Sequence, residues 1–249
     1  MLHVDDEKRL AEFQSFLSAS APPVADPGSA IERMLFVLLG YKNDPLSKMS
    51  DAWENLWACP GLRRELLQLL ALLEDRSRQL TTPLAGRLAS LPFRIHGTYS
   101  RDEVMAGFGK LDRKGGVMLI QAGVDYSDAF ACDSFFVTLE KSEHDYTPTT
   151  LYKDYPLSQH RFHWESQSSC HEGTPTGRRY LEVRAGGTQE ALLFVRQRRH
   201  DDRGETSPYL LLGPVSYHTH RGGRPMQIEW ELAHPMPARD FQEMKVAAG

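Results

Sequence analysis

The spacing of hydrophobic residues changes once along this chain, from a helical period to a period of two. Up to about residue 90, apolar residues recur three or four positions apart, as on one face of a helix. From about residue 110, short stretches alternate between apolar and polar residues and are separated by turn-forming residues. The pattern predicts an α+β protein with a helical part at residues 1–90 and a β-rich part at residues 91–249.

The first part contains three stretches with helical spacing, at about residues 6–17, 29–40 and 61–80. Asp5 or Asp6 can cap the first stretch, and Ser29 opens the second. The third carries a broad stripe of leucines. Such stripes are typical of packing faces, so this part is expected to form a small helical bundle or connector.

The second part is expected to hold two short helices and a series of strands. Ser100 and Glu103 have the spacing of a capping box, and Phe241 lies in a short closing helix. Turn signals such as Gly186-Gly187 and Gly222-Gly223 separate the strands. Seven short strands with few helices indicate a curled sheet or barrel. The predicted strands are residues 117–122, 135–140, 161–167, 179–183, 191–196, 209–212 and 226–232.

The central stretch of residues 162–167 combines an aromatic pattern with polar side chains. Successive side chains of a strand point to opposite faces. One face would therefore be mainly aromatic, and the other would carry acceptors and amides. The first face holds Phe162, Trp164 and Ser166, and the second holds His163, Glu165 and Gln167.

Composition narrows the class of protein. No apolar run approaches the roughly 18 residues that span a bilayer, and the first residues do not form a signal peptide, so a cytoplasmic protein is expected. Three widely spaced cysteines imply neither a disulfide framework nor a zinc knuckle. The net charge of -4 argues against a uniformly basic surface, although residues 153–203 hold nine Lys or Arg against seven Asp or Glu. No cofactor and no metal site are expected.

Several runs of residues resemble one known family. They cover about two-thirds of the chain in order, and the run FHWESQ is distinctive. The family is the C-terminal domain of unknown function in fusions of phospholipase-D-type nucleases with superfamily II helicases. The matching runs are residues 96–103, 135–139, 151–155, 162–167, 193–196 and 213–214.

The resemblance implies a function in DNA recognition. Such fusions include type IV, modification-dependent restriction enzymes, in which this domain looks like an SRA-type reader of 5-methylcytosine or 5-hydroxymethylcytosine with a PUA-like β-barrel. The expected partner is double-stranded DNA with modified cytosine. This chain has no Walker A motif and no HxKxxxxD nuclease motif. The helicase and nuclease are therefore expected elsewhere on the polypeptide or on a partner, with residues 1–90 as the connector.

A pocket for a flipped cytosine needs an acceptor for the N4 amino group, donors for O2 and N3, and aromatic or apolar walls. Asp154 or Glu165 can accept from N4, Gln167 can donate, and a tyrosine or Trp164 can stack. Two of these residues have structural alternatives: Trp164 as a core anchor, and Asp154 as the cap of a turn. The candidate pocket consists of Tyr152, Asp154, Tyr155, Trp164, Glu165 and Gln167.

Four arginines are candidates for phosphate contacts: Arg178, Arg179, Arg196 and Arg198. Arg178 and Arg179 can equally form a solvated strand edge.

Two other functions stay open. Asp154, Glu165 and Gln167 fit a variant PD-(D/E)xK nuclease in which two carboxylates hold a metal, although Gln167 replaces the usual lysine. Alternatively, the leucine-rich first part fits an adaptor that couples a motor to a nuclease without touching DNA.

Overall fold

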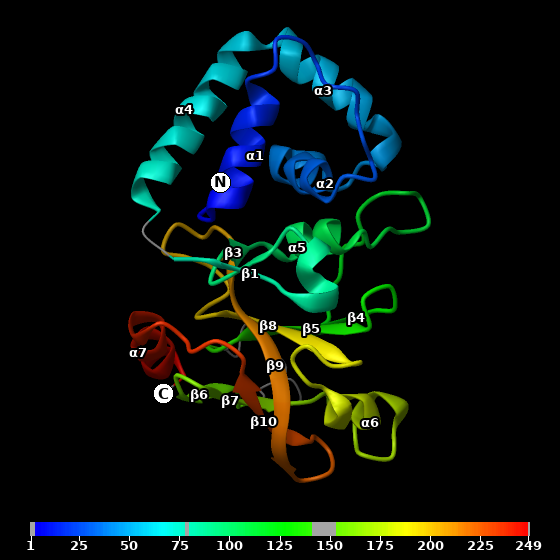
Figure 1. The fold of residues 1–249 in the computed structure, drawn as a ribbon, viewed down its shortest axis with the longest axis vertical. Helices are drawn as coiled ribbons and strands as arrows, with labels where there is room; N and C mark the ends of the chain where they lie inside the picture. Colours follow the sequence, from blue (N-terminus) through cyan, green and yellow to red (C-terminus); the bar gives the residue numbers. More distant parts are fainter. Residues whose placement is uncertain (1–2, 78–79, 141–152, 249) are drawn as a thin grey trace. The chain divides into compact units, whose positions relative to one another are not determined.

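The computed structural model describes residues 3–77, 80–140 and 153–248 (Figure 1). Contacts between residues divide the chain into two compact units, Met1–Gln121 and Ala122–Gly249. The first is mainly helical, and the second combines a mixed sheet with two helices. The chain is therefore an α+β protein, as the sequence predicts. No described helix is long and apolar enough to cross a membrane.

The two predicted caps open the first two helices. Helix α1 (Glu7–Leu17) follows Asp6, whose side chain accepts a hydrogen bond from the Arg9 N–H at 2.9 Å. Helix α2 (Ala30–Phe36) follows Ser29, whose hydroxyl accepts from the Glu32 N–H at 3.3 Å. Each side chain satisfies an amide that has no partner within the helix. A π-turn, η1 (Val37–Tyr41), continues α2, and Gly40 supplies its positive φ of 100°.

The remaining helices of this part complete a small bundle. After the 3-10 turn η2 (Leu46–Lys48), helix α3 (Met49–Ala58) places Trp53 in the core, where Phe16 and Phe36 meet it edge to face. Helix α3 was not among the three stretches with helical spacing predicted from the sequence. Helix α4 (Pro60–Arg76) begins with Pro60 in its first turn, where an N–H has no helical partner. It packs alongside α1 (Figure 1).

The first unit ends in short elements and one further helix. Strands β1 (Thr82–Pro83) and β2 (Arg94–Ile95) pair antiparallel on either side of the turn η3 (Gly86–Ser90), and β3 (Thr98–Tyr99) follows. Helix α5 (Arg101–Phe108) has the predicted capping box between Ser100 and Glu103. Gly109 then ends it in the left-handed conformation.

A buried arginine explains why residues 91–121 join the helical unit. The guanidinium of Arg9 on α1 is fully buried and binds the carboxylates of Asp6 and Glu103, the latter at 2.6 Å. Asp5 at 3.2 Å and the Thr98 carbonyl at 2.7 Å complete its shell. The change of hydrophobic period near residue 90 marks a change of element type. The contacts instead divide the chain after residue 121, because α5 is tied to α1 and packs on α2.

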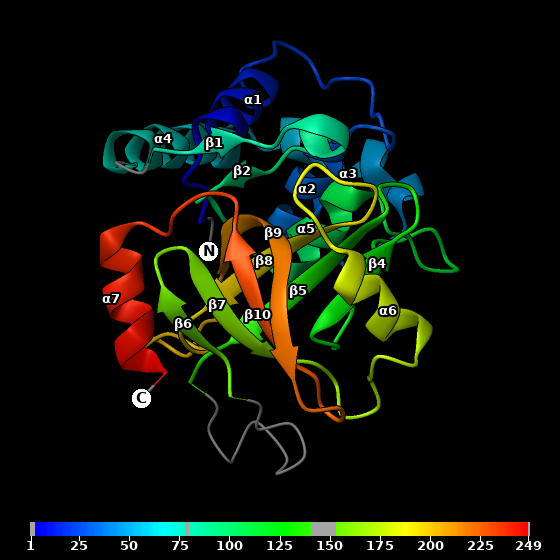
Figure 2. The same ribbon diagram turned by 60° about the horizontal axis from the view of Figure 1, so that its bottom comes forward.

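The second unit is built on one mixed sheet. Its strands lie in the order β4, β5, β8, β9, β10, β7, β6 (Figures 1 and 2), and β5 and β8 pair parallel while the other neighbours pair antiparallel. Helices α6 (Pro175–Glu182) and α7 (Ala238–Ala247) belong to the same unit. The strands are β4 (Val124–Ser127), β5 (Cys132–Thr138), β6 (Tyr155–Ser158), β7 (Arg161–Glu165), β8 (Glu190–Arg196), β9 (Tyr209–Arg221) and β10 (Gln227–Leu232).

Three of the predicted strands agree closely with β7, β8 and β10, the strand predicted at residues 135–140 overlaps the C-terminal half of β5, and the closing helix is α7. Residues 117–122 do not form a named strand, β9 is longer than predicted, and β4 and β6 were not predicted. The prediction of a strand at residues 179–183 is wrong, because residues 179–182 belong to α6 and Val183 is the residue that caps its C-terminal end. Thr174 caps that helix with Pro175 in its first turn. Tyr180 and Val183 are both fully buried at a spacing of three, which is helical.

The sheet curls around its own core. Phe135 on β5 stacks on Trp164 on β7 with ring centroids 4.7 Å apart, although β8, β9 and β10 lie between these strands in the sheet. Tyr180 of α6 and Met244 of α7 join the same core. Within the described residues, the edge strands β4 and β6 do not pair with each other, so the curled sheet is not a closed barrel.

Candidate functional site

The polar face of β7 continues across its neighbours. Phe162, Trp164 and Ser166 are buried, whereas the alternate residues point away from the core, as predicted. The outward residues of β7 pair with polar residues of β10, and β6 extends the same face (Figure 2). No helix lies in front of these strands in the ribbon of Figure 2. We call this surface the outer face; it consists of Tyr155, Arg161, His163, Glu165, Gln227, Glu229 and Glu231.

An aromatic pair lies at the centre of the outer face. Tyr155 and His163 are paired across β6 and β7, and their rings stack with centroids 4.6 Å apart and an interplanar angle of 25°. The Tyr155 side chain is 37% exposed, and His163 is half-buried. Glu229 pairs with His163 from β10 on the other side. The pair therefore offers an accessible ring face beside groups that can form hydrogen bonds.

The carboxylates of Asp154 and Glu165 each accept a hydrogen bond from the backbone of the other residue's segment. Oδ1 of Asp154 accepts from the Glu165 N–H at 3.0 Å, and Oε2 of Glu165 accepts from the Lys153 N–H at 3.2 Å. Oε1 of Glu165 also accepts from Nε2 of Gln227 at 3.2 Å. Asp154 is buried, and Glu165 is half-buried. These bonds fix the start of β6 against the end of β7 and so position Tyr155.

The sequence left two roles open for Trp164, a stacking wall of the pocket and an anchor of the core. The structure shows that it is an anchor of the core. Its side chain is only 5% exposed, and its ring packs against Phe135, Tyr180 and Trp230. It is therefore a core anchor and not a wall of the outer face. Gln167 is half-buried just beyond β7. Tyr152, the remaining predicted pocket residue, lies outside the described residues.

Arg178 and Arg179 are neighbours on α6 but lie in different surroundings. Arg178 is exposed. Arg179 makes two hydrogen bonds to the buried carboxylate of Asp133, at 2.8 and 2.9 Å, and its guanidinium lies 4.0 Å from the ring centre of Tyr126. Burial raises the pKa of Asp133 although Arg179 opposes it, and the hydrogen bonds to Asp133 raise the pKa of Arg179. Arg179 therefore joins α6 to β5.

Arg196 and Arg198 differ in the same way. Arg196, at the end of β8, is buried and donates from Nε to the Thr138 hydroxyl at 2.9 Å and from a terminal nitrogen to the Ser207 carbonyl at 3.2 Å. Its guanidinium also lies over the ring of Tyr209. Arg198 is exposed and forms a 2.8 Å ion pair with Asp202. Only Arg198 of these two is directed to solvent.

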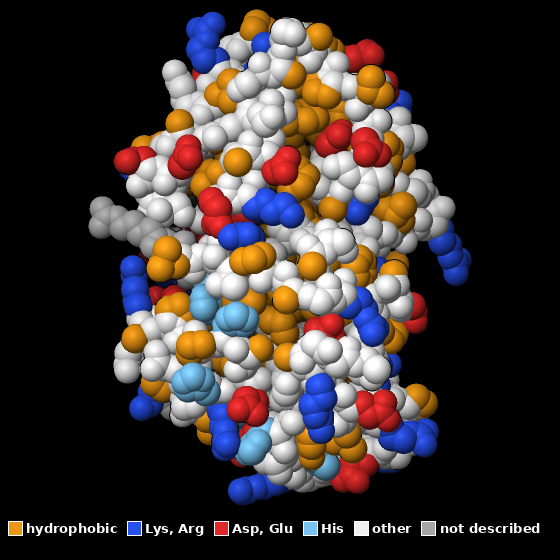
Figure 3. Space-filling model, in the orientation of Figure 1, with side chains coloured by type: hydrophobic (Ala, Val, Ile, Leu, Met, Phe, Trp, Pro, Cys, Tyr) orange, Lys and Arg blue, Asp and Glu red, His pale blue; other side chains and the backbone are white. Residues whose placement is uncertain are grey.

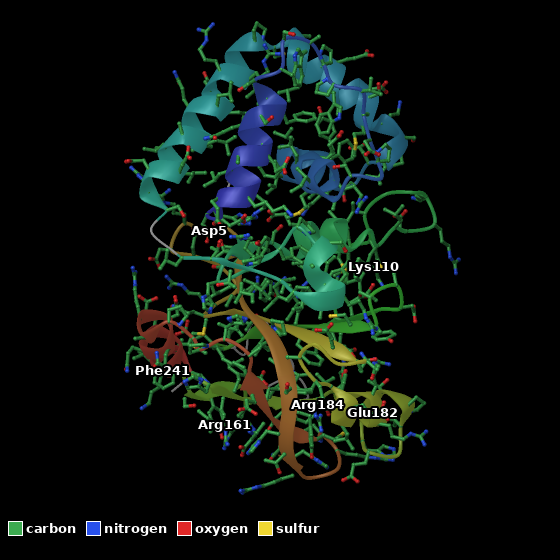
Figure 4. All side chains as sticks on the ribbon, in the orientation of Figure 1. Asp5, Lys110, Arg161, Glu182, Arg184 and Phe241 are labelled. Atoms are coloured by element: carbon green, nitrogen blue, oxygen red, sulfur yellow. The ribbon has the colours of Figure 1, made fainter. Side chains whose placement is uncertain are left out.

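A second polar cluster lies where β9 bulges. Thr219 pairs with Glu229 and Tyr217 with Trp230, so His218 is the additional residue of a bulge. The bulge brings Tyr217 and His220 to one face, where the Tyr217 hydroxyl meets Nδ1 of His220 at 2.8 Å. Nε2 of His220 meets Glu172 at 2.8 Å. Arg184, labelled beside β9 in Figure 4, lies 5.6 Å from the Tyr217 ring centre.

Only part of the outer face was predicted from the sequence. Tyr155 and Glu165 were assigned to the site, but no role was given to Arg161 and His163, which share the outward face of β7 with Glu165. The alternation that identified Glu165 could have identified both. Gln227 and Glu229 could not be found in this way, because only the pairing of β7 with β10 brings them close.

The charges on the visible surface are mixed. In the view of Figure 3, basic and acidic side chains are interspersed, the histidines lie in the lower half, and no patch of one sign dominates. The outer face follows this pattern, with Arg161 labelled in Figure 4 and three glutamates nearby. Over residues 3–77, 80–140 and 153–248, no three His, Cys, Asp or Glu side chains are grouped so that they could hold a metal ion.

Comparison with known proteins places the chain in a family. No curated protein matches the sequence. The model of the family described as "Domain of unknown function (DUF3427)" matches residues 93–244, which is more than half of the chain and begins close to the expected boundary at residue 91. The match contains β7, the outer face, the contacts between Asp154 and Glu165, and the polar cluster at the bulge of β9. The chain therefore belongs to the DUF3427 family.

Proposed function

We propose that this chain is the DNA-recognition part of a modification-dependent restriction or helicase system. It reads 5-methylcytosine or 5-hydroxymethylcytosine in double-stranded DNA by flipping the base out of the duplex. The motor and the nuclease are supplied by other parts of the polypeptide or by partner proteins. An SRA-like or PUA-like origin of the curled sheet is part of the same proposal, which the resemblance noted in the sequence supports.

The observation that carries the proposal is the exposed stack of Tyr155 on His163. A base that leaves a duplex loses its stacking partners, and an exposed aromatic ring restores about 1–3 kcal/mol of that interaction. In this proposal Tyr155 takes the stacking role, since Trp164 is occupied in the core.

Polar groups beside the stack match the edge of a cytosine. Glu165 uses its carboxylate oxygens for two bonds of 3.2 Å, and each oxygen has a further lone pair for the N4 amino group. The amides of Gln167 and Gln227 are the donors for O2 and N3. Arg161, next to His163 on the same face, supplies a positive charge for the flanking phosphate.

The proposal is tested by measuring Kd for matched duplexes that contain cytosine, 5-methylcytosine or 5-hydroxymethylcytosine at one position. A modified duplex is expected to bind more tightly. Tyr155→Ala should weaken that binding about tenfold through the lost stacking. Tyr155→Phe, which keeps the ring, is the matched control and should bind normally. Equal affinity for all three duplexes over a range of salt concentrations would contradict base recognition.

A nuclease assay separates recognition from catalysis. Asp154 and Glu165 are the carboxylates that a metal-dependent nuclease would use. Incubation with a supercoiled plasmid and Mg²⁺ is expected to leave the DNA intact. Cleavage that requires Mg²⁺ and disappears in Glu165→Ala would replace the proposed recognition role by a catalytic one.

A further inference from the structure

Some leucine side chains of helix α4 are not covered by the rest of the helical unit and stay exposed. Leu70 is its one buried residue among those described, and it faces the bundle in which α4 packs on α1 and α3. Leu62 and Leu72 are 50% and 44% exposed, and Leu69 is half-buried. Exposed apolar side chains that share one flank of a helix are typical of interaction sites.

The flank has the spacing of a coiled-coil seam. Glu65, Leu69, Leu72 and Arg76 follow one another at intervals of four, three and four residues, which places them in one stripe along the helix. Leu62 extends the stripe at its N-terminal end. Glu65 and Arg76 are both exposed. Two leucines are therefore bordered by a negative charge on one side and a positive charge on the other.

This order of charges is complementary to itself in an antiparallel arrangement. When two α4 helices align antiparallel, Leu69 of each copy lies opposite Leu72 of the other. Glu65 of each copy then lies opposite Arg76 of the other, so both ends of the contact are ion pairs. A parallel arrangement would place Glu65 against Glu65 and Arg76 against Arg76, which is repulsive. The antiparallel arrangement also opposes the two helix dipoles favourably.

We propose that α4 is the interface of a symmetric homodimer, formed by antiparallel pairing of this stripe with the same stripe on a second copy of the chain. A two-fold contact requires one surface to be complementary to itself, and the sequence of this stripe fulfils that condition. Helix α4 is about 25 Å long at 1.5 Å per residue, which limits the contact area. The dimer therefore forms reversibly and depends on protein concentration.

Charge exchange tests the proposed pairing in the full chain. Sedimentation equilibrium over a concentration series should show dimers of the unaltered protein. Glu65→Arg and Arg76→Glu should each be monomeric, because each creates two repulsive pairs. An equimolar mixture of these two variants should form dimers again, as should the double variant with both exchanges. A chain that stays monomeric at all concentrations, or a mixture that stays monomeric, would overturn the proposal.

Control variants separate the stripe from the general charge of α4. Arg64 and Asp75 are exposed on another side of the helix. Arg64→Glu and Asp75→Arg repeat the same changes of charge and should leave the dimer unaffected. Leu72→Gln should abolish it, while its circular dichroism spectrum stays unchanged because Leu72 is exposed. Dimers that persist in Leu72→Gln and in both single charge variants would place the interface elsewhere.

Discussion

At the scale of single residues, the sequence identified local partners but not distant ones. Asp5 or Asp6 was predicted as a cap, and the structure shows that it is Asp6; the capping box that includes Glu103 is confirmed. The same two carboxylates also bind the buried Arg9, which lies 94 residues from Glu103 in the sequence. A capping motif is visible within four residues, whereas an ion pair over that separation exists only after the chain has folded.

The Glu103 carboxyl makes the stability of the first unit dependent on pH. Burial alone would raise its pKa, but the charge of Arg9 and hydrogen bonds from His3 and the Ser100 N–H outweigh burial and lower the pKa from 4.5 to about 2. Glu103 therefore stabilises the fold fully above about pH 4.5, and this contribution, on the order of 3 kcal/mol, is lost as the pH falls toward 2.

The expected outcome is a free energy of unfolding that decreases between pH 4.5 and pH 2, measured by urea denaturation. Glu103→Gln should be less stable at neutral pH and should lose less stability over this interval. Glu54→Gln, on the exposed side of α3, is the control and should follow the unaltered protein. An equally steep acid loss in Glu103→Gln would rule out this carboxyl as the cause.

Two buried tyrosines should respond oppositely to loss of the hydroxyl. Among the described residues, the buried Tyr180 hydroxyl has no hydrogen-bond partner. The Tyr99 hydroxyl accepts from the Arg94 N–H at 2.7 Å and donates to Asp6 at 3.3 Å. Tyr180→Phe should leave the free energy of unfolding unchanged or raise it by up to about 1 kcal/mol, whereas Tyr99→Phe should lower it by about 1 kcal/mol. Equal losses in thermal denaturation would contradict this assignment.

At the scale of elements, the alternation in residues 162–167 was sufficient to predict β7 and its two faces. It predicted the direction of the side chains but not their distance from the surface, and so it could not decide between a core and a pocket role for Trp164. That decision depends on Phe135, Tyr180 and Trp230, which come from three other elements. The local sequence pattern therefore determines to which side of the strand a side chain points. Its burial is determined by the elements that pack on that side in the folded protein.

Helix α6 contains the segment that was wrongly predicted to be a strand. Residues 179–183 include tyrosine and valine, which are common in strands, but the segment is too short to distinguish a strand from one turn of a helix. The stronger signal was the preceding Thr174 and Pro175, which cap and open the helix. The outer face was similarly incomplete in the sequence analysis, because β6 was not predicted and its pairing partner His163 received no role.

Glycine substitutions test how tightly α6 is placed. A Cβ at Gly177 would lie 2.0 Å from the His171 carbonyl oxygen, so Gly177→Ala should lower the free energy of unfolding by about 2 kcal/mol or more. At Gly61, in the first turn of α4, a Cβ would meet no atom of the described part of the chain within 4 Å. Gly61→Ala should therefore leave stability unchanged or raise it by up to about 1 kcal/mol. Denaturation with urea measures both, and a tolerated Gly177→Ala would contradict the close approach.

At the scale of the whole molecule, the start of the family match and the boundary between the two structural units fall at different residues. The DUF3427 match begins at residue 93, within the unit that ends at Gln121. The segment from residue 93 to 121 thus belongs to the family by sequence and to the helical unit by its contacts. The buried ion pair of Glu103 with Arg9 ties α5, which lies within the family match, to helix α1, which lies outside it. Residues 1–90 are therefore required for the core around α5.

Binding to DNA should depend on the exposed arginines and not on the buried ones. Arg178 is exposed, and the ion pair of Arg198 with Asp202 is a surface pair that a phosphate can replace. Replacing either by alanine should weaken binding to modified and plain duplexes alike and reduce the salt dependence by about one charge, with no change in Tm. Arg179→Ala and Arg196→Ala should instead lower Tm, because both side chains have partners inside the fold. Unchanged salt dependence in a double variant of Arg178 and Arg198 would exclude phosphate contacts by these two arginines.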